Sequence, residues 1–307
     1  MASNLDRGDV VVVGERRATW PALAVPGVVW LLLFFLTPLY AVLAVAMGYR
    51  DPILLSARPE WNPARWDPSA FGDVIADLVG GRLAVIGVRT LIYVGIASLL
   101  CLLIGYPVAY LVARRAGRWR GLMLLLLLAP FWINYLMRML AWVNLLSPDG
   151  WVNRLVDAAG LAPVDWLAGR PSTVILGMVY GYIPFFILPL YAALDRIDRS
   201  TLEAARDLGA SPFEAFRRVT LPLSKQGILA GLVIVMLPMF GDYYTPNLLS
   251  GSPRTRLIGN EIDQFINQST SQGGRGAALT IVLMAFVAVL MAYYLVSVAR
   301  ETRRVRR

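Results

Sequence analysis

The stretch Ser200–Pro222, STLEAARDLGASPFEAFRRVTLP, is the most informative part of this chain. It is charged and helix-prone, and it lies between two long apolar segments. Two capping boxes are predicted within it, one pairing Ser200 with Glu203 and one pairing Ser211 with Glu214. The pattern therefore predicts two short helices in succession, each with its own N-terminal cap.

Gly209 stands between the two predicted helices, where the first is expected to end. Pro212 occupies the first position of the second helix, which suits its fixed backbone angle. Phe213 and Phe216 are one turn apart and are expected to share a face of that helix. A rigid elbow that presents phenylalanines indicates a docking surface for another protein. An ordinary amphipathic connector is the alternative.

The same segment resembles the Glu-Ala-Ala loop of ATP-binding-cassette (ABC) importer permeases. That pattern reads E-A-A, three residues, G, nine residues, I, one residue, L-P. The matching positions here are Glu203, Ala204, Ala205, Gly209, Val219, Leu221 and Pro222. Val219 replaces isoleucine and keeps a β-branched apolar side chain. The resemblance implies a coupling helix that enters a groove of an ATP-hydrolysing subunit, with Phe213 and Phe216 supplying apolar docking area.

The composition is that of a membrane protein, because 57% of the 307 residues are hydrophobic. Crossing a bilayer takes about 20 apolar residues. Six segments meet this length: 22–48, 90–113, 122–147, 171–194, 225–249 and 276–299. We expect an all-α integral membrane fold, which the resemblance makes a type I ABC importer permease. One domain, 21–299, is expected between cytosolic tails 1–20 and 300–307, with an uncleaved first span.

Loop charges predict the orientation of the chain. With a cytosolic N-terminus, the inner segments 1–21, 114–121, 195–225 and 300–307 hold twice as many basic residues as the outer loops. The positive-inside rule therefore favours cytosolic termini and a cytosolic Glu-Ala-Ala segment. The net charge of +9 is then explained by membrane topology, and we expect no nucleic-acid partner.

Residue counts exclude several kinds of chemistry. The sequence has no histidine and a single cysteine, Cys101, so His-based triads, zinc motifs and disulfide frameworks are excluded and no metal site is expected. No G-x-x-x-x-G-K-[ST] motif occurs, so energy must come from another polypeptide. A membrane-embedded enzyme would need paired catalytic groups at membrane depth, and only one acid lies there. A non-transporting scaffold is a third class, which would not need an elbow for an ATPase.

Two charged residues fall within apolar segments, Arg138 and Asp242. Each costs about 2.5–3.5 kcal/mol in hydrocarbon, so neither is expected to face lipid. At a rise of about 1.5 Å per residue, both would lie at similar depth in straight helices. A mutual ion pair is therefore one interpretation of Asp242.

The other interpretation places Asp242 on a translocation path that a cation follows. Pro238 and Pro246 flank it, a pattern typical of a broken helix lining a cavity. Carboxylates and aromatic faces attract ammonium groups. The candidate path residues are Asp242, Tyr243, Tyr244, Trp132, Asn134, Tyr135 and Arg138, with Trp142, Tyr180 and Tyr182 as further neighbours. Packing is the alternative role for each of the aromatic residues.

The segments GDYYTPNLLSG (241–251) and APFWINYLMRMLAW (129–142) resemble permeases of spermidine/putrescine importers. The resemblance implies a bacterial inner-membrane subunit that forms half of a translocation path. Its expected partners are a second permease, two ATPase subunits that bind ATP-Mg, an extracytoplasmic substrate-binding protein and membrane lipid. The chain itself is expected to hold no cofactor and to have no catalytic site. Another small solute, such as a different organic cation, a phosphonate or a metal, is the alternative substrate.

Overall fold

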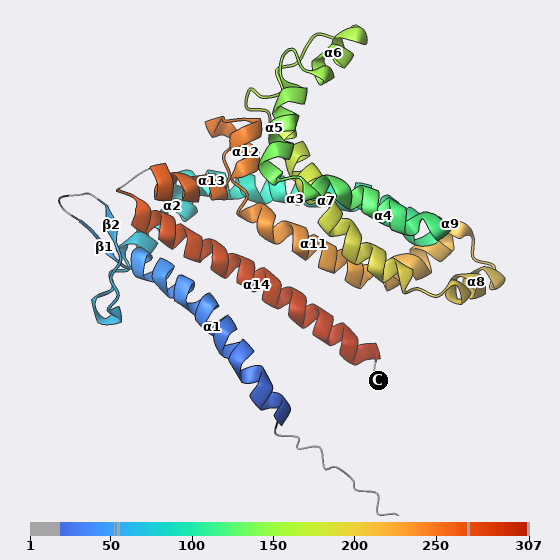
Figure 1. Cartoon of the computed structure of the whole chain (residues 1–307), viewed down its shortest axis with the longest axis horizontal. Helices are drawn as coiled ribbons and strands as arrows, with labels where there is room; N and C mark the ends of the chain where they lie inside the picture. Colours follow the sequence, from blue (N-terminus) through green and yellow to red (C-terminus); the bar gives the residue numbers. More distant parts are fainter. Residues whose placement is uncertain (1–18, 52, 54–55, 269–270, 306–307) are drawn as a thin grey trace, which may run out of the picture.

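The computed structural model describes residues 19–51, 53, 56–268 and 271–305, and within them the chain is mostly helical (Figure 1). The long helices are α1 (Thr19–Ala46), α3 (Arg82–Arg114), α7 (Pro171–Asp195), α11 (Lys225–Phe240) and α14 (Gly273–Val305). The shorter α-helices are α2 (Ser69–Gly80), α4 (Arg120–Leu128), α5 (Tyr135–Leu146), α6 (Trp151–Ala158), α8 (Arg199–Asp207), α9 (Pro212–Ala215), α10 (Leu221–Leu223), α12 (Tyr244–Leu249) and α13 (Ile258–Asp263).

Tighter and wider turns connect these helices. The 3-10 turns are η1 (Pro63–Arg65), η2 (Gly117–Trp119), η3 (Ala129–Trp132) and η5 (Pro253–Thr255), and the π-helical turns are η4 (Phe216–Thr220) and η6 (Gln264–Gln268). Two short antiparallel strands, β1 (Tyr49–Arg50) and β2 (Ala57–Arg58), form a ribbon after α1.

Four helices in the described residues are long and apolar enough to cross a membrane, and two bent helix pairs raise the number to six if each pair forms one span. Five of the predicted apolar segments lie on these elements almost entirely, whereas the segment 225–249 does so only up to Phe240, where α11 ends. The predicted straight helix over 122–147 is wrong, because the chain bends by 89° between Trp132 and Tyr135. Pro130 lies in η3, Ile133 is extended, and the Asn134 side chain caps a new helix by accepting from the Leu136 amide at 2.8 Å.

The main core lies where α3, α7 and α11 pack together. Phe186 of α7 is fully buried at its centre, and Gly105 of α3 and Gly231 of α11 leave the space for its ring. A Cβ atom on Gly231 would lie 2.8 Å from that ring. Small residues at helix contacts let apolar helices approach closely in a membrane.

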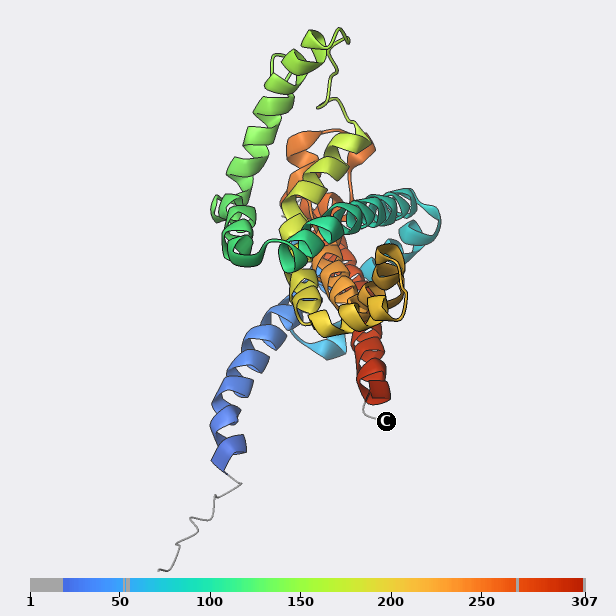
Figure 2. The same ribbon diagram turned by 90° about the vertical axis from the view of Figure 1, so that its right-hand side faces the viewer.

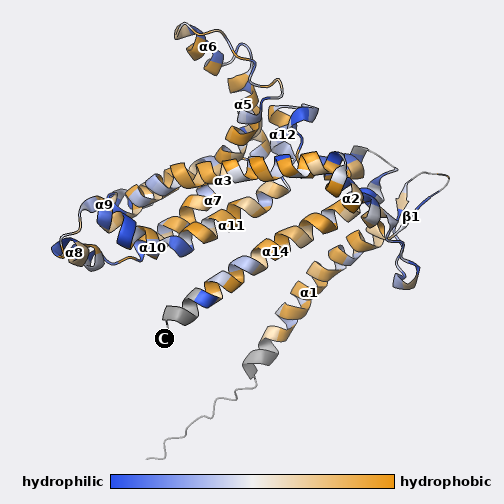
Figure 3. Cartoon of the chain, turned by 180° about the vertical axis from the view of Figure 1, so that it is seen from behind, coloured by the Kyte–Doolittle hydropathy of each residue, from blue (hydrophilic) through white to orange (hydrophobic). Residues whose placement is uncertain are grey.

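A second core joins α1, α2 and α14 near the β-ribbon. Beyond it, α1 and α5–α6 extend away from the bundle, as the view turned by 90° shows (Figure 2). The side chains of α1 between Val28 and Leu36 are exposed and apolar, as expected of a surface that faces lipid or another membrane subunit. Hydrophilic residues gather around α8 and α9 at one end of the molecule, opposite α2 and the β-ribbon (Figure 3).

Residues 1–18 of the expected N-terminal tail and 306–307 of the expected C-terminal tail lie outside the described residues. In the described part, α14 continues through Val305.

Candidate functional site

The Glu-Ala-Ala segment forms a helical elbow made of α8, α9, η4 and α10. Gly209 has a φ of +87°, a conformation that costs little only for glycine. Its amide donates to the Arg206 carbonyl at 2.8 Å, and the next amide, of Ala210, donates to Ala205 at 3.1 Å. The predicted glycine turn is therefore present, and the backbone hydrogen bonds that end α8 also set the direction of α9.

Only one of the two predicted capping boxes is present. Ser211 and Glu214 form it fully, since the Ser211 hydroxyl accepts from the Glu214 amide and the Glu214 carboxylate accepts from the Ser211 amide. The box predicted at Ser200 is wrong, because α8 starts at Arg199 and its N-cap is Asp198. Ser200 therefore lies inside the helix and cannot cap it.

The two phenylalanines do not share an exposed face. Phe213 is 69% exposed. Phe216 instead packs against Tyr106 and Tyr110 of α3, with ring centroids 5.6 and 5.9 Å apart and nearly perpendicular planes. The turn changes from α to π geometry at Phe216, which rotates the ring away from the face of Phe213. The prediction that both rings dock on another protein is wrong for Phe216.

The rest of the elbow leaves small and apolar groups accessible. Glu203, Ala204 and Gly209 are exposed, as are Leu221 and Pro222, whereas Ala205 and Val219 are half-buried. Leu208 is 89% exposed, although its apolar side chain follows directly on the Glu-Ala-Ala residues. Sequence reasoning missed Leu208, and its position just before the glycine turn is the signal that could have found it.

Hydrogen bonds and an ion pair lower the pKa of the Glu214 carboxyl at the start of α9. The backbone amide and the hydroxyl of Ser211, together with Arg218, hold the pKa of the Glu214 carboxyl below its ordinary value. The Arg218 guanidinium lies 3.7 Å from that carboxylate. Glu214 is therefore ionised at neutral pH and fixes the start of α9.

The second candidate site is the break between α11 and α12. The helix ends at Phe240, and Asp242 is 6% exposed. One carboxylate oxygen of Asp242 accepts from the Thr245 amide at 3.1 Å, and the other accepts from the Thr245 hydroxyl at 2.5 Å. The Tyr135 hydroxyl donates to the same oxygen at 3.5 Å, and Tyr182 is a further hydrogen-bond partner. The predicted break is confirmed, and Asp242 accepts from an amide in the first turn of α12, whose N-cap position is Tyr243.

Sequence reasoning missed Thr245, which is fully buried and also lies 2.5 Å from the Tyr135 hydroxyl. The spacing D-x-x-T before Pro246 is the signal that could have found it, since an aspartate side chain at the start of a helix accepts from an amide of the first turn.

Arg138 and Asp242 are close to the same tyrosine but form no ion pair within the described residues. Arg138 is 8% exposed, and its guanidinium lies 4.1 Å from the ring centroid of Phe131 and 5.4 Å from that of Tyr135. Its Nε and Nη1 atoms have no hydrogen-bond partner in the described chain. The ion-pair interpretation is therefore wrong, because the bend before α5 directs Arg138 into an aromatic cluster.

The remaining path candidates differ in exposure. Trp132 is 80% exposed. The rings of Tyr243 and Tyr244 stack with centroids 4.1 Å apart, and Tyr244 is exposed. Trp142 packs edge-on against Tyr180. The structure thus brings Asp242, Tyr135 and Arg138 together, whereas the Tyr243–Tyr244 ring pair follows Asp242 in the chain and the Trp132 side chain is largely exposed.

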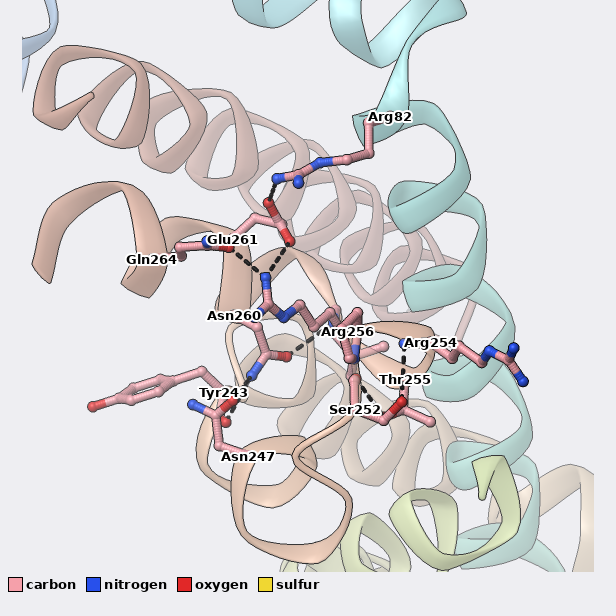
Figure 4. Close-up of polar contacts among 12 residues, drawn as sticks. Arg82, Tyr243, Asn247, Ser252, Arg254, Thr255, Arg256, Asn260, Glu261 and Gln264 are labelled. Atoms are coloured by element: carbon pink, nitrogen blue, oxygen red, sulfur yellow. Dashed lines mark hydrogen bonds and ion pairs between the residues drawn. The ribbon is translucent and has the colours of Figure 1, made fainter. Parts of the chain in front are cut away.

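A buried network ties this break to the loop that follows it (Figure 4). The Asn260 amide group donates to the Tyr243 carbonyl and to Asn247 Oδ1, both at 2.9 Å, and its own oxygen accepts from the Leu257 amide. Its neighbour Glu261 is buried and bonded to Arg82, and it lies 3.8 Å from Arg256. The position of Tyr243 is thereby fixed by α13, although neither Asn260 nor Glu261 was predicted as a site residue.

A bundle of apolar helices with a protruding elbow is the architecture of an ABC transporter membrane subunit. A crystal structure of a bacterial alginate ABC transporter, in complex with a pentasaccharide-bound periplasmic protein, matches 90% of this chain and 92% of its own chain with a TM-score of 0.71 at 19% identity. The MetNI methionine ABC transporter matches 71% of this chain and 94% of its own with a TM-score of 0.50 at 19% identity. These structures define the fold.

Residues 101–304 match the family described as the binding-protein-dependent transport system inner membrane component. The chain belongs to this family, and it is a multi-pass permease subunit of an ABC importer in the inner membrane. The spermidine/putrescine transport system permease protein PotB of Haemophilus influenzae is 37% identical over 86% of this chain and 89% of its own length. PotB of Escherichia coli K12 is 39% identical over 64% of this chain and 72% of its own.

Proposed function

We propose that this permease carries polyamines such as spermidine and putrescine into the cell. The observation that carries the proposal is the 37% identity to a spermidine/putrescine permease over 86% of the chain. The aromatic groups near the α11–α12 break fit such a substrate, because ammonium groups are attracted to aromatic faces and to carboxylates. Tyr243 and Tyr244, which directly follow Asp242 in the chain, offer a pair of rings with centroids 4.1 Å apart.

Within the path, the residues have separate roles. Tyr244, Tyr243 and Trp132 present ring faces to the passing cation, and Asn134 and Tyr135 add polar groups next to them. Asp242 contributes negative charge while it holds the break through Thr245. Arg138 is kept from repelling the substrate because its guanidinium is turned into the rings of Phe131 and Tyr135.

Transport is powered from outside this chain. Two ATPase subunits bind ATP-Mg and close, and a second permease completes the path. An extracytoplasmic binding protein delivers the substrate to the outer loops. The elbow lies on the cytosolic side together with both termini, and Glu203, Ala204, Ala205, Gly209 and Phe213 contact the ATPase. Val219, Leu221 and Pro222 continue the elbow into α11, so closure of the ATPases moves the break at its far end.

The test is uptake of labelled spermidine and putrescine by the reconstituted complex of both permeases, the ATPases and the binding protein. Unlabelled competitors represent other organic cations, phosphonates and divalent metals. ATP-dependent uptake that only polyamines inhibit is the expected result. Uptake that a phosphonate or a metal inhibits, with no effect of either polyamine, would assign a different substrate.

A further inference from the structure

A polar cavity lies next to the start of α8, where α3 and α7 end and α4 begins. Its volume is about 250 Å³. It is lined by Arg114, Arg120, Asp195, Asp198 and Arg199, with Gly117 at its edge. Arg114 ends α3, Arg120 begins α4, Asp195 ends α7 and Arg199 begins α8.

The positive charge in this cavity is only partly balanced. Arg120 lies 3.6 Å from Asp195, and both side chains are largely accessible. Arg114 uses one nitrogen to donate to the Ile197 carbonyl at 2.8 Å, and its Nε and Nη2 atoms have no partner in the described chain. No ion pair of the described residues includes Arg199.

The surroundings add further positive charge. Arg115, Arg118 and Arg196 lie on the segments that form the cavity, whereas Asp195 and Asp198 are the acids there. Asp198 makes no side-chain hydrogen bond to cap α8. The N-terminal amides of that nine-residue helix therefore favour a negative group at the same place.

The cavity lies at the depth of lipid headgroups, because α3, α4 and α7 all leave the apolar layer at its rim. Exposed apolar side chains lie close in sequence to the lining residues, namely Leu111 one turn before Arg114, Trp119 next to Arg120, and Leu122 in the first turn of α4. Tryptophan is typical of the membrane interface, and basic pockets between the ends of spanning helices bind anionic lipid headgroups. A soluble anion would gain nothing from the neighbouring apolar side chains, whereas a phospholipid would place its acyl chains on them.

We propose that this cavity binds the phosphate of an anionic phospholipid. Arg199, which is exposed, donates to the phosphate oxygens. Arg114 and Arg120 add positive charge, Arg120 while it remains paired with Asp195. The assignment to the inner leaflet rests on the proposed function, which places the elbow in the cytosol. Because Arg199 begins α8, the bound lipid also fixes the start of the elbow.

Native mass spectrometry of the purified transporter complex, titrated with phosphatidylglycerol or phosphatidylcholine, tests the proposal. Phosphatidylglycerol is expected to bind more tightly than phosphatidylcholine. The double variant Arg114→Gln/Arg199→Gln should lower its affinity about thirtyfold, since each basic residue near a membrane surface contributes about fivefold in affinity. Arg118→Gln is the control, because Arg118 lies on the same loop but does not line the cavity, and it should lower the affinity much less than the double variant does.

Further measurements distinguish a lipid from other occupants of the cavity and control for misfolding of the double variant. Arg199→Lys keeps the charge and should retain binding, so loss in Arg199→Gln alone with retention in Arg199→Lys supports the site even if the double variant does not fold. Equal lipid affinity of the double variant and the wild type would overturn the proposal. Displacement of phosphatidylglycerol by equimolar inorganic phosphate would assign the site to a free anion instead.

Two outcomes distinguish this inference from the transport function. Unchanged lipid binding in the double variant, combined with weaker binding of the ATPase subunits, would mean that the cavity receives carboxylates of the ATPase. Lipid binding as expected in a complex that does not import polyamines would refute the proposed substrate and leave the lipid site intact.

Discussion

Gly209 determines the geometry of the elbow, because its φ of +87° sets the turn between α8 and α9. A side chain there costs about 1–2 kcal/mol in backbone strain, and the space around it is open in the chain itself. We therefore expect Gly209→Val to insert normally and to lose ATP-dependent uptake, since the added side chain projects into the ATPase groove. The measurement is uptake at matched expression.

Gly160 offers a matched control for that experiment. It has a φ of +76°, equally open surroundings, and a position after α6 far from the elbow. Gly160→Val carries the same backbone strain and should retain uptake. Equal loss of uptake in both variants would show that strain, and not docking, explains the effect.

The Ser211–Glu214 capping box should make the elbow sensitive to acid. Because the pKa of Glu214 is lowered in the folded chain, its contribution to stability is complete above the unfolded value of about 4.3. That contribution is lost as the pH falls through the lower folded value. The protection factor of the Glu214 amide against hydrogen exchange should therefore be constant near neutrality and fall below that range. A pH-independent protection factor in the wild type, equal to that of Glu214→Gln, would contradict this expectation.

Asp242 holds the break through Thr245, and the proposed function gives it a second role in the path; substitutions can separate the two. Asp242→Ala leaves the buried Thr245 amide without its side-chain acceptor, which costs about 1–3 kcal/mol. Asp242→Asn keeps an acceptor for the amide and removes the charge. We expect the alanine variant to lower the Tm of the complex markedly, and the asparagine variant to keep the Tm while weakening polyamine uptake. Wild-type uptake by a stable Asp242→Asn complex would show that the Asp242 carboxylate does not take part in transport.

At the scale of elements, the π turn η4 gives the two phenylalanines different surroundings, since the Phe216 ring packs inward and the Phe213 ring stays exposed. Phe216 packs on two tyrosines of α3, and each aromatic pair contributes about 0.5–1.5 kcal/mol beyond area burial. Phe216→Ala should therefore lower the Tm, whereas Phe213→Ala should leave it unchanged and weaken binding of the ATPase subunits. Thermal unfolding and co-purification of the ATPase measure the two effects. An unchanged Tm in Phe216→Ala would contradict the inward packing.

The sequence was sufficient to predict the elements that depend on local signals. Hydropathy located the six apolar segments, and Ser211, Gly209 and the paired prolines predicted a cap, a turn and a break. The sequence did not predict side-chain orientations where the backbone bends or changes from α to π geometry. The bend before Tyr135 and the π turn at Phe216 depend on tertiary packing, so the orientations of Arg138 and Phe216 could not be deduced from spacing. The same applies to Asn260, whose partners lie 13 and 17 residues away.

At the scale of the whole molecule, the elbow and the break lie at the two ends of one continuous connection. α10 leads into α11 at a bend of 59°, and α11 packs along α7 and α3 up to Phe240. Beyond Phe240, Asp242 and Asn260 fix the break from two sides. The elbow and the residues proposed to line the path are therefore joined through a packed helix, which is the connection that the proposed function requires.

The most direct test is uptake of labelled spermidine into proteoliposomes that contain both permeases, with and without the ATPase subunits, for the wild type and Gly209→Val. We predict uptake only with the wild-type elbow, the ATPase subunits and ATP all present. Spermidine uptake by the permeases without the ATPase subunits, or full ATP-dependent uptake by Gly209→Val, would contradict the conclusion that this chain is moved through its elbow by another subunit.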